Sequence, residues 1–170
     1  YYYGDLEGAL PPSEESLAIR RETRERWGIA ESLYGLGLIQ SARGSCQVAK
    51  QHFVEAVQVA TDIGDRNRIA LYQIGLAYLA VDEGDVPKAF ELLDQSYSFM
   101  LDTEDRWGIA KCLDGYAWAI AGSAPESAAM IWAAADRIRE DISSPLPPGE
   151  QRLKDNRVRP YREAMPTLDA

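Results

Sequence analysis

The chain has very few of the residues on which enzyme active sites most often depend. Its 170 residues include a single histidine, His52, and two cysteines, Cys46 and Cys112, with no CxxC spacing. One histidine excludes multi-histidine metal sites, and we expect no His-based catalytic triad and a solvent-facing His52. The cysteines fit a reduced, cytoplasmic protein better than a disulfide scaffold. We therefore expect no enzyme activity, no catalytic residues, no metal and no cofactor.

Long apolar runs and an excess of basic residues are missing as well. The apolar runs are too short for a membrane-spanning helix, and no secretory signal is recognisable. The 18 Lys and Arg residues are outnumbered by 27 Asp and Glu, which gives a formal net charge of −9. Nucleic-acid binding needs a basic face, so this composition argues against it. An acidic surface favours basic or neutral partners.

What the chain does contain is an internal repeat. The segment ERWGIA at residues 25–30 returns as DRNRIA at 65–70 and as DRWGIA at 105–110. Self-similarity at a fixed period is the sequence signature of repeat architectures. Seven columns share the interval of forty residues without a gap: Gly4, Gly44 and Gly84; Ala9, Ala49 and Ala89; Arg26, Arg66 and Arg106; Ile29, Ile69 and Ile109; Ala30, Ala70 and Ala110; Gly35, Gly75 and Gly115; Gly37, Ala77 and Ala117.

Each repeat unit is predicted to form two helices. In the central unit, apolar residues at helical spacing predict a first helix over about 65–81 and a second over about 87–100. No segment shows sustained strand alternation, so we expect six or seven helices and no sheet. The signals that bound the helices are N-cap aspartates, turn glycines, first-turn prolines and one capping box: Asp65 and Asp105; Gly44 and Gly84; Pro87 and Pro125; Ser123 and Glu126.

Glycine inside a helix needs an explanation, because it costs about 1 kcal/mol relative to alanine. Gly35, Gly75 and Gly115 recur at one position of the predicted first helices. We expect them to allow neighbouring helices to approach closely, and we expect the neighbouring small-residue column of Gly37, Ala77 and Ala117 to be buried at helix contacts.

The repeat resembles the tetratricopeptide (TPR) family. Its pattern of L-G, G, A, F and A is matched by Leu36, Gly37, Gly44, Ala49, Phe53 and Ala56, and again by Leu76, Ala77, Gly84, Ala89, Leu93 and Ser96. The third unit slips by about one residue, the period is longer than the usual 34 residues, and the family's final proline is missing. The resemblance implies an all-α, right-handed α-solenoid of antiparallel helix pairs whose first helices line a concave groove.

A second resemblance is narrower. Residues 105–110, 112–121, 128–140 and 145–148 look like the C-terminal end of bacterial multidomain regulators. These join a STAND-type ATPase module, a TPR region and often an adenylate-cyclase or LuxR-type helix-turn-helix module. None of the catalytic modules is present in this sequence, which has no G-x-x-x-x-G-K-[ST] loop and no basic recognition helix. The resemblance implies an interaction or sensor region belonging or related to a bacterial signalling or transcriptional regulator.

Both ends depart from the repeat. Residues 1–141 comprise a half repeat, two full repeats and a final repeat. Pro11 and Pro12 would interrupt a helix, so the first helix should start at Pro12 or Ser13. In residues 142–170 we expect a proline-rich loop, a short capping helix near 149–158 that Pro160 and Pro166 end, and a loose tail. Basic residues in this segment are nearly balanced by acidic ones, which favours a solvated helix.

The groove is the candidate functional site. By the TPR resemblance, the positions that face it are Tyr34, Leu38, Ile74, Tyr78, Lys111, Asp114 and Trp118. Three of these are aromatic and would form an apolar floor, and the acidic residues Glu31, Asp82 and Asp114 edge it. The alternative is that the next helix or the C-terminal segment covers them. Trp27 and Trp107 either pack on the preceding helix or stack on a ligand.

These features predict a non-catalytic interaction or sensor domain. The partner should be a protein or peptide that is apolar with a basic end, or another domain of a parent protein. A homodimer is also possible. The alternative function is a small-molecule sensor that closes the same groove on an apolar ligand.

Overall fold

The computed structural model describes residues 6–164 and contains eight helices in that range. No strand occurs among the described residues. In chain order the helices are α1 (Leu6–Glu22), α2 (Arg26–Ala42), α3 (Cys46–Ile63), α4 (Arg66–Asp82), α5 (Val86–Asp102), α6 (Arg106–Ile120), α7 (Pro125–Asp141) and α8 (Pro148–Ala164). The all-α prediction is confirmed, with one or two helices more than expected.

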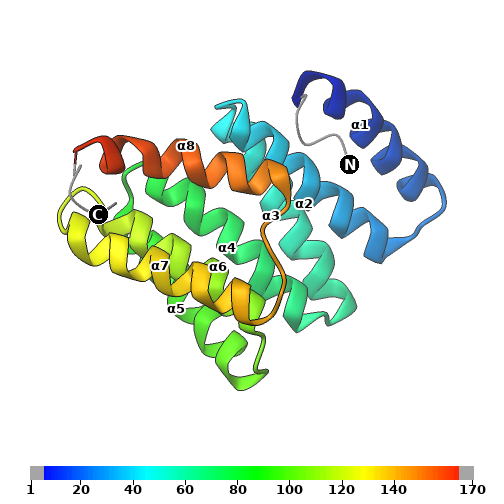
Figure 1. Ribbon diagram of the computed structural model, residues 1–170. Coiled ribbons are helices and arrows are strands. Elements are labelled where there is room, and N and C mark those ends of the chain that lie inside the picture. Colours follow the sequence, from blue (N-terminus) through cyan, green and yellow to red (C-terminus); the bar gives the residue numbers. More distant parts are fainter. Residues whose placement is uncertain (1–5, 165–170) are drawn as a thin grey trace.

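The helices stack in sequence order. From α1 to α7 each helix packs on the next one in the chain, and α4 also contacts α2 on one side and α6 on the other (Figure 1). This neighbour-to-neighbour arrangement is that of a helical solenoid. The handedness, the antiparallel pairing and the superposition of units after a forty-residue shift stay predictions.

Local signals in the sequence place most helix ends correctly. Asp65 and Asp105 act as N-caps, since their carboxylates accept hydrogen bonds from the backbone N–H of Arg68 and Gly108 at 3.0 and 2.9 Å. The turn glycines Gly44, Gly64 and Gly84 have φ of 75°, 73° and 79°, a conformation that favours glycine. The predicted capping box of α7 is wrong. The N-cap there is Ala124, without a side-chain cap.

The small-residue columns lie where helices touch. Ala77 and Ala117 are fully buried, and Gly37 lies directly against the ring of Phe53 in α3. A Cβ on Gly75 would also meet that ring, at 3.0 Å. The close-approach interpretation is thus confirmed for these columns with one exception. A Cβ on Gly35 would meet nothing within 4 Å.

The prolines near the ends were expected to interrupt or end helices, and they do not. α1 begins at Leu6 and runs through Pro11 and Pro12. The prolines lack two backbone donors near its first turns. The Ser13 hydroxyl donates to the Ala9 carbonyl oxygen at 2.7 Å. α8 is longer than the predicted 149–158 and continues through Pro160. The predicted loose tail around Pro166 lies outside the described residues.

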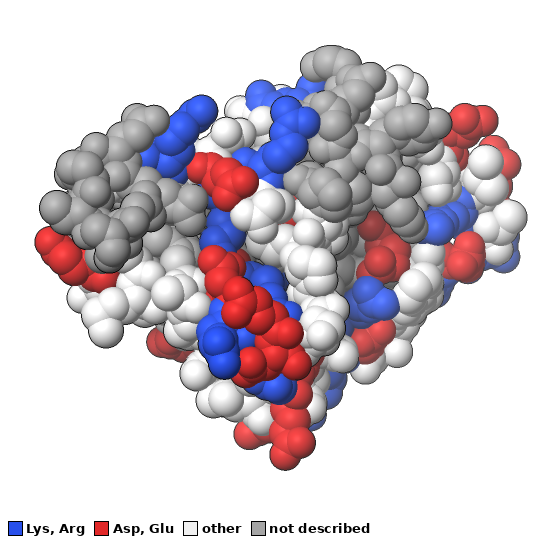
Figure 2. Space-filling model, viewed as in Figure 1, with Lys and Arg blue, Asp and Glu red and all other residues white. Residues whose placement is uncertain are grey.

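Charges of both signs are interspersed on the surface rather than separated. Figure 2 shows acidic and basic side chains adjoining one another on the face that carries α8. Some of them form ion pairs between the two helices of one unit, such as Arg26 with Asp62 at 2.6 Å and Arg106 with Asp141 at 3.1 Å. Within residues 6–164, no helix has both the length and the apolar character needed to cross a membrane.

Candidate binding groove

The predicted groove residues fall into three groups. Tyr78 and Trp118 lie under α8, and Lys111 and Asp114 are buried beside them, exposed by 2% and 9%. Leu38 borders both this covered part and an open basin, and Tyr34 lies in the wall of that basin. Ile74 is wrong as a groove residue. It is fully buried in the core between helices, because position 74 of α4 turns inward.

α8 covers the C-terminal part of the groove. It lies in front of α4 and α6 (Figure 1) and leaves a cavity of only about 40 Å³ beneath it. Val158 of α8 belongs to one apolar cluster with Ala117, Ala128 and Trp132, and Tyr161 packs beside Trp132 at 6.2 Å between ring centroids. Of the two alternatives that the sequence left open, the structure therefore shows coverage by the C-terminal segment for Tyr78 and Trp118.

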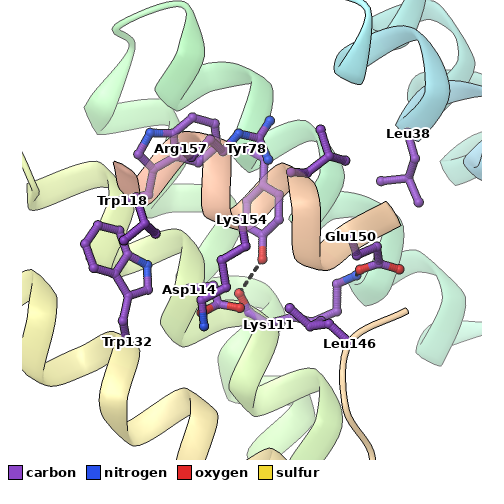
Figure 3. Close-up of a pocket in the computed structure, with 12 residues that line it drawn as sticks. Leu38, Tyr78, Lys111, Asp114, Trp118, Trp132, Leu146, Glu150, Lys154 and Arg157 are labelled. Atoms are coloured by element: carbon purple, nitrogen blue, oxygen red, sulfur yellow. Dashed lines mark hydrogen bonds and ion pairs between the residues drawn. The ribbon is translucent and has the colours of Figure 1, made fainter. Parts of the chain in front are cut away.

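Arg157 of α8 fixes the helix on the aromatic floor. Its guanidinium carbon lies 3.8 Å from the ring centroid of Trp118 and 5.5 Å from that of Tyr78 (Figure 3). The same group pairs with Asp82 of α4 at 3.0 Å and reaches the Ser41 hydroxyl of α2 at 3.4 Å. A guanidinium that stacks on a ring and pairs with a carboxylate is a strong anchor at a protein surface.

A buried charge cluster holds the middle of α8. Lys154 pairs with Asp114 of α6 at 3.1 Å and also with Asp136 of α7. Arg139 of α7 contacts the same two carboxylates, lying 3.0 Å from Asp136. Burial raises the pKa of Asp114, and the two cations Lys154 and Arg139 oppose that rise. Two cations and two carboxylates thus neutralise each other beneath the helix.

Lys111 is the third anchor. Its ammonium pairs with Glu150 at the start of α8, donates to the Tyr34 hydroxyl at 3.2 Å and lies 4.5 Å from the ring centroid of Trp107. The Tyr78 hydroxyl donates to the Lys111 carbonyl oxygen at 2.7 Å (Figure 3). A lysine predicted at the edge of an open groove is therefore an internal link between α2, α6 and α8.

The N-terminal part of the groove remains open as a basin of about 720 Å³ over α2. One wall is α1, and the other is formed by Trp107 and the beginning of α8. Trp27, at one end of the basin, is 49% exposed, and one of its faces stacks on Arg68 at 4.8 Å.

The charged groups of the basin already have partners. Arg68 pairs with Glu31, which also accepts a hydrogen bond from the Tyr72 hydroxyl at 2.7 Å. Arg20 donates to the Gly28 carbonyl oxygen and to the Ser32 hydroxyl, each at 2.8 Å. The basin therefore presents mainly apolar surface to an incoming molecule.

Sequence reasoning missed the residues that α8 contributes. The near balance of acidic and basic residues in that segment predicts a solvated helix, whereas Glu150, Lys154 and Arg157 pair with residues of α6 and α4. Their spacing with Leu153, Val158 and Tyr161, at three and four residues, is the signal that places them all on one face. Within the described part of the chain, no group of three or more His, Cys, Asp or Glu side chains is arranged to hold a metal ion.

Comparison with protein-family models, with curated proteins and with solved structures finds no match to this chain.

Proposed function

We propose that the chain is a non-catalytic interaction domain, a TPR-like right-handed solenoid whose concave groove binds helical segments of a protein partner. The resemblance to bacterial multidomain regulators supports a protein partner of this kind, or another domain of a parent signalling protein, as the natural ligand. The preferred segment is apolar with a basic end. On this chain, the binding surface of the groove comprises Leu38, Tyr78, Asp114 and Trp118, with Tyr34 at the open edge of the groove.

One observation carries the proposal: the groove holds α8 by the chemistry expected of a partner. α8 offers an apolar row of Leu153, Val158 and Tyr161, together with basic side chains that pair with acidic groove residues. Lys154 meets Asp114 at 3.1 Å and Arg157 meets Asp82 at 3.0 Å. The surface is thus complementary to a helix that carries apolar and basic side chains on one face, and a partner helix of that kind would compete with α8.

The test is an exchange experiment on the whole chain. A labelled peptide of residues 148–164 is titrated into the natural chain and into the Arg157→Ala chain, and binding is followed by fluorescence anisotropy. The tethered α8 competes at a high effective concentration. Arg157→Ala weakens that competitor while leaving the groove intact, because Asp82 is partly exposed to water. We expect the peptide to bind the variant at least about tenfold more tightly, which corresponds to about 1.4 kcal/mol.

A peptide in which Arg157 is itself replaced by alanine serves as the matched control. It should lose most of the affinity for the Arg157→Ala chain, because it cannot stack on Trp118. Equal binding of both peptides, or no saturable binding at millimolar peptide, would show that the groove has no preference for a basic helix.

A second candidate function is a small-molecule sensor. The basin of about 720 Å³ lies within the range of about 300–1,000 Å³ found for ligand pockets, and two tryptophans line it. A metabolite panel in a thermal-shift assay distinguishes this candidate, because a ligand raises the midpoint by mass action. Replacement of Trp27 by alanine should abolish any such shift.

A further inference from the structure

The second helix of each central unit is enclosed between two first helices. In α5, the Ser96 hydroxyl donates to the Ala70 carbonyl oxygen of α4 at 3.0 Å, whereas Leu93 lies against Gly115 of α6. In α3, Phe53 touches α2 at Gly37 and α4 at Gly75. The enclosed faces are at most 1% exposed and consist of Ala49, Phe53, Ala56 and Ala60 in α3, and of Ala89, Leu93, Ser96 and Met100 in α5.

The corresponding face of α1 is not enclosed. Forty residues earlier, the same positions are Ala9, Ser13, Ser16 and Arg20, and all four are partly exposed. They form one wall of the open basin. α1 packs on α2, and no described helix covers its face on the other side. The wall therefore has the form of a helix-binding face with only one helix bound.

The floor of the basin contains a hollow at Gly35. In α6, a Cβ on Gly115 would lie 2.7 Å from the Leu93 side chain and 2.9 Å from the Tyr78 ring, because both fill the space in front of it. A Cβ on Gly35 would meet nothing within 4 Å. Ser13 stands in the column of Leu93, and its side chain is too short to fill the same space. A helix glycine without a packing neighbour is an unexplained cost of about 1 kcal/mol in the isolated chain.

We propose that the basin between α1 and α8 binds an α-helix of a partner protein, which resembles the chain's own first helices and places a bulky apolar side chain against Gly35. The proposal rests on the interaction-domain function and adds a second, separate seat. α4 shows how such a helix binds, since its Tyr78 fills the space in front of Gly115.

The size and polarity of the basin agree with this occupant. A helix is about 10 Å wide and rises 1.5 Å per residue, so about 720 Å³ accommodates roughly two turns. Two turns present one row of apolar side chains at a spacing of three or four residues. The basic and acidic groups of the walls, Arg20, Glu31 and Arg68, are already paired within the chain. The contact is therefore apolar, unlike the charged seat of α8.

The probe is a labelled synthetic peptide of residues 65–83, the α4 segment, titrated into the full chain and followed by anisotropy. We expect saturable binding that is weakened at least about tenfold by Tyr78→Ala in the peptide. Gly35→Leu in the chain fills the hollow from α2 itself, since a Cβ there meets nothing within 4 Å, and it should weaken binding of the unaltered peptide by a similar factor. Ala18→Leu is the matched control, because Ala18 is exposed and does not line the basin.

Three results would overturn the inference. They are the absence of saturable binding at millimolar peptide, equal binding of the natural and Tyr78→Ala peptides, and equal binding by the Gly35→Leu and Ala18→Leu chains. Self-association that Gly35→Leu abolishes would instead assign the seat to a second copy. Exchange of the 148–164 peptide at the α8 seat is measured in parallel. Success there with failure of the 65–83 peptide overturns this inference alone and leaves the interaction-domain proposal standing.

Discussion

Replacement by alanine should change stability differently at the three glycines of one repeat column, Gly35, Gly75 and Gly115. Gly35→Ala adds a methyl group to open space, since nothing lies within 4 Å of its Cβ position. The variant should therefore show only the gain in helix propensity, about 1 kcal/mol. For a chain of this length that raises the thermal midpoint by about 2–4 °C.

Gly75→Ala and Gly115→Ala gain the same propensity but lose it to crowding. The new methyl at Gly75 would lie 3.0 Å from the Phe53 ring, and that at Gly115 would lie 2.7 Å from Leu93 and 2.9 Å from Tyr78. Overpacking costs about 1–3 kcal/mol. We expect Gly75→Ala to be close to neutral or mildly destabilising, and Gly115→Ala to be net destabilising by about 1–2 kcal/mol.

Urea unfolding followed by circular dichroism at 222 nm measures all three variants. The slope of free energy against urea should remain unchanged, so the midpoints report stability directly. The expected order of midpoints is Gly35→Ala, the natural chain, then Gly115→Ala. A Gly35→Ala midpoint below that of the natural chain would refute the hollow, and a Gly115→Ala midpoint above it would refute the close approach of α4, α5 and α6.

Three further outcomes follow from burial. Ala77→Leu, at a fully buried position, should cost about 1–3 kcal/mol by overpacking, whereas Ala133→Leu on the exposed face of α7 should leave the urea midpoint unchanged. Burial lowers the pKa of His52 below 6.5, so the unfolded chain binds more protons and stability falls as pH drops through and below 6.5. The loss of midpoint between pH 7.5 and 5 should therefore be smaller in His52→Gln. Cys112 is fully buried and its thiol pKa is raised to about 12 by burial, so a thiol reagent should label only Cys46 in the native chain and both cysteines in urea.

The sequence predicted the helices of the repeat well because their signals are local. An aspartate that caps a helix acts within one turn, and a turn glycine needs only its own φ, so Asp65 and Gly84 carry their information without the rest of the fold. The helices at the ends were judged by proline alone. That was insufficient for α1 and α8, since Pro12 and Pro160 are tolerated inside helices there.

The site was predicted less completely because its accessibility depends on tertiary docking. The rings of Tyr78 and Trp118 lie 5.9 Å apart between centroids, but the repeat columns could not show that Arg157, far along the chain, stacks on both of them. Ile74 was misplaced because a pattern taken from shorter repeats assigns its direction only approximately. The hollow at Gly35 could not be predicted from the sequence, because the glycine column suggests that all three positions are packed equally. Only the small size of Ser13, compared with Phe53 and Leu93 in its own column, distinguishes the first unit.

The docking of α8 has a consequence for how the chain folds. From α1 to α7 each helix packs on its neighbours in the chain, which favours rapid and stepwise growth of the stack during synthesis. Arg157 instead contacts Ser41, 116 residues earlier. α8 is made after every helix that it covers, so the aromatic floor at Tyr78 and Trp118 stays uncovered on the nascent chain until α8 has left the ribosome. That interval is when the groove is most exposed to aggregation, to chaperones and to competing helices.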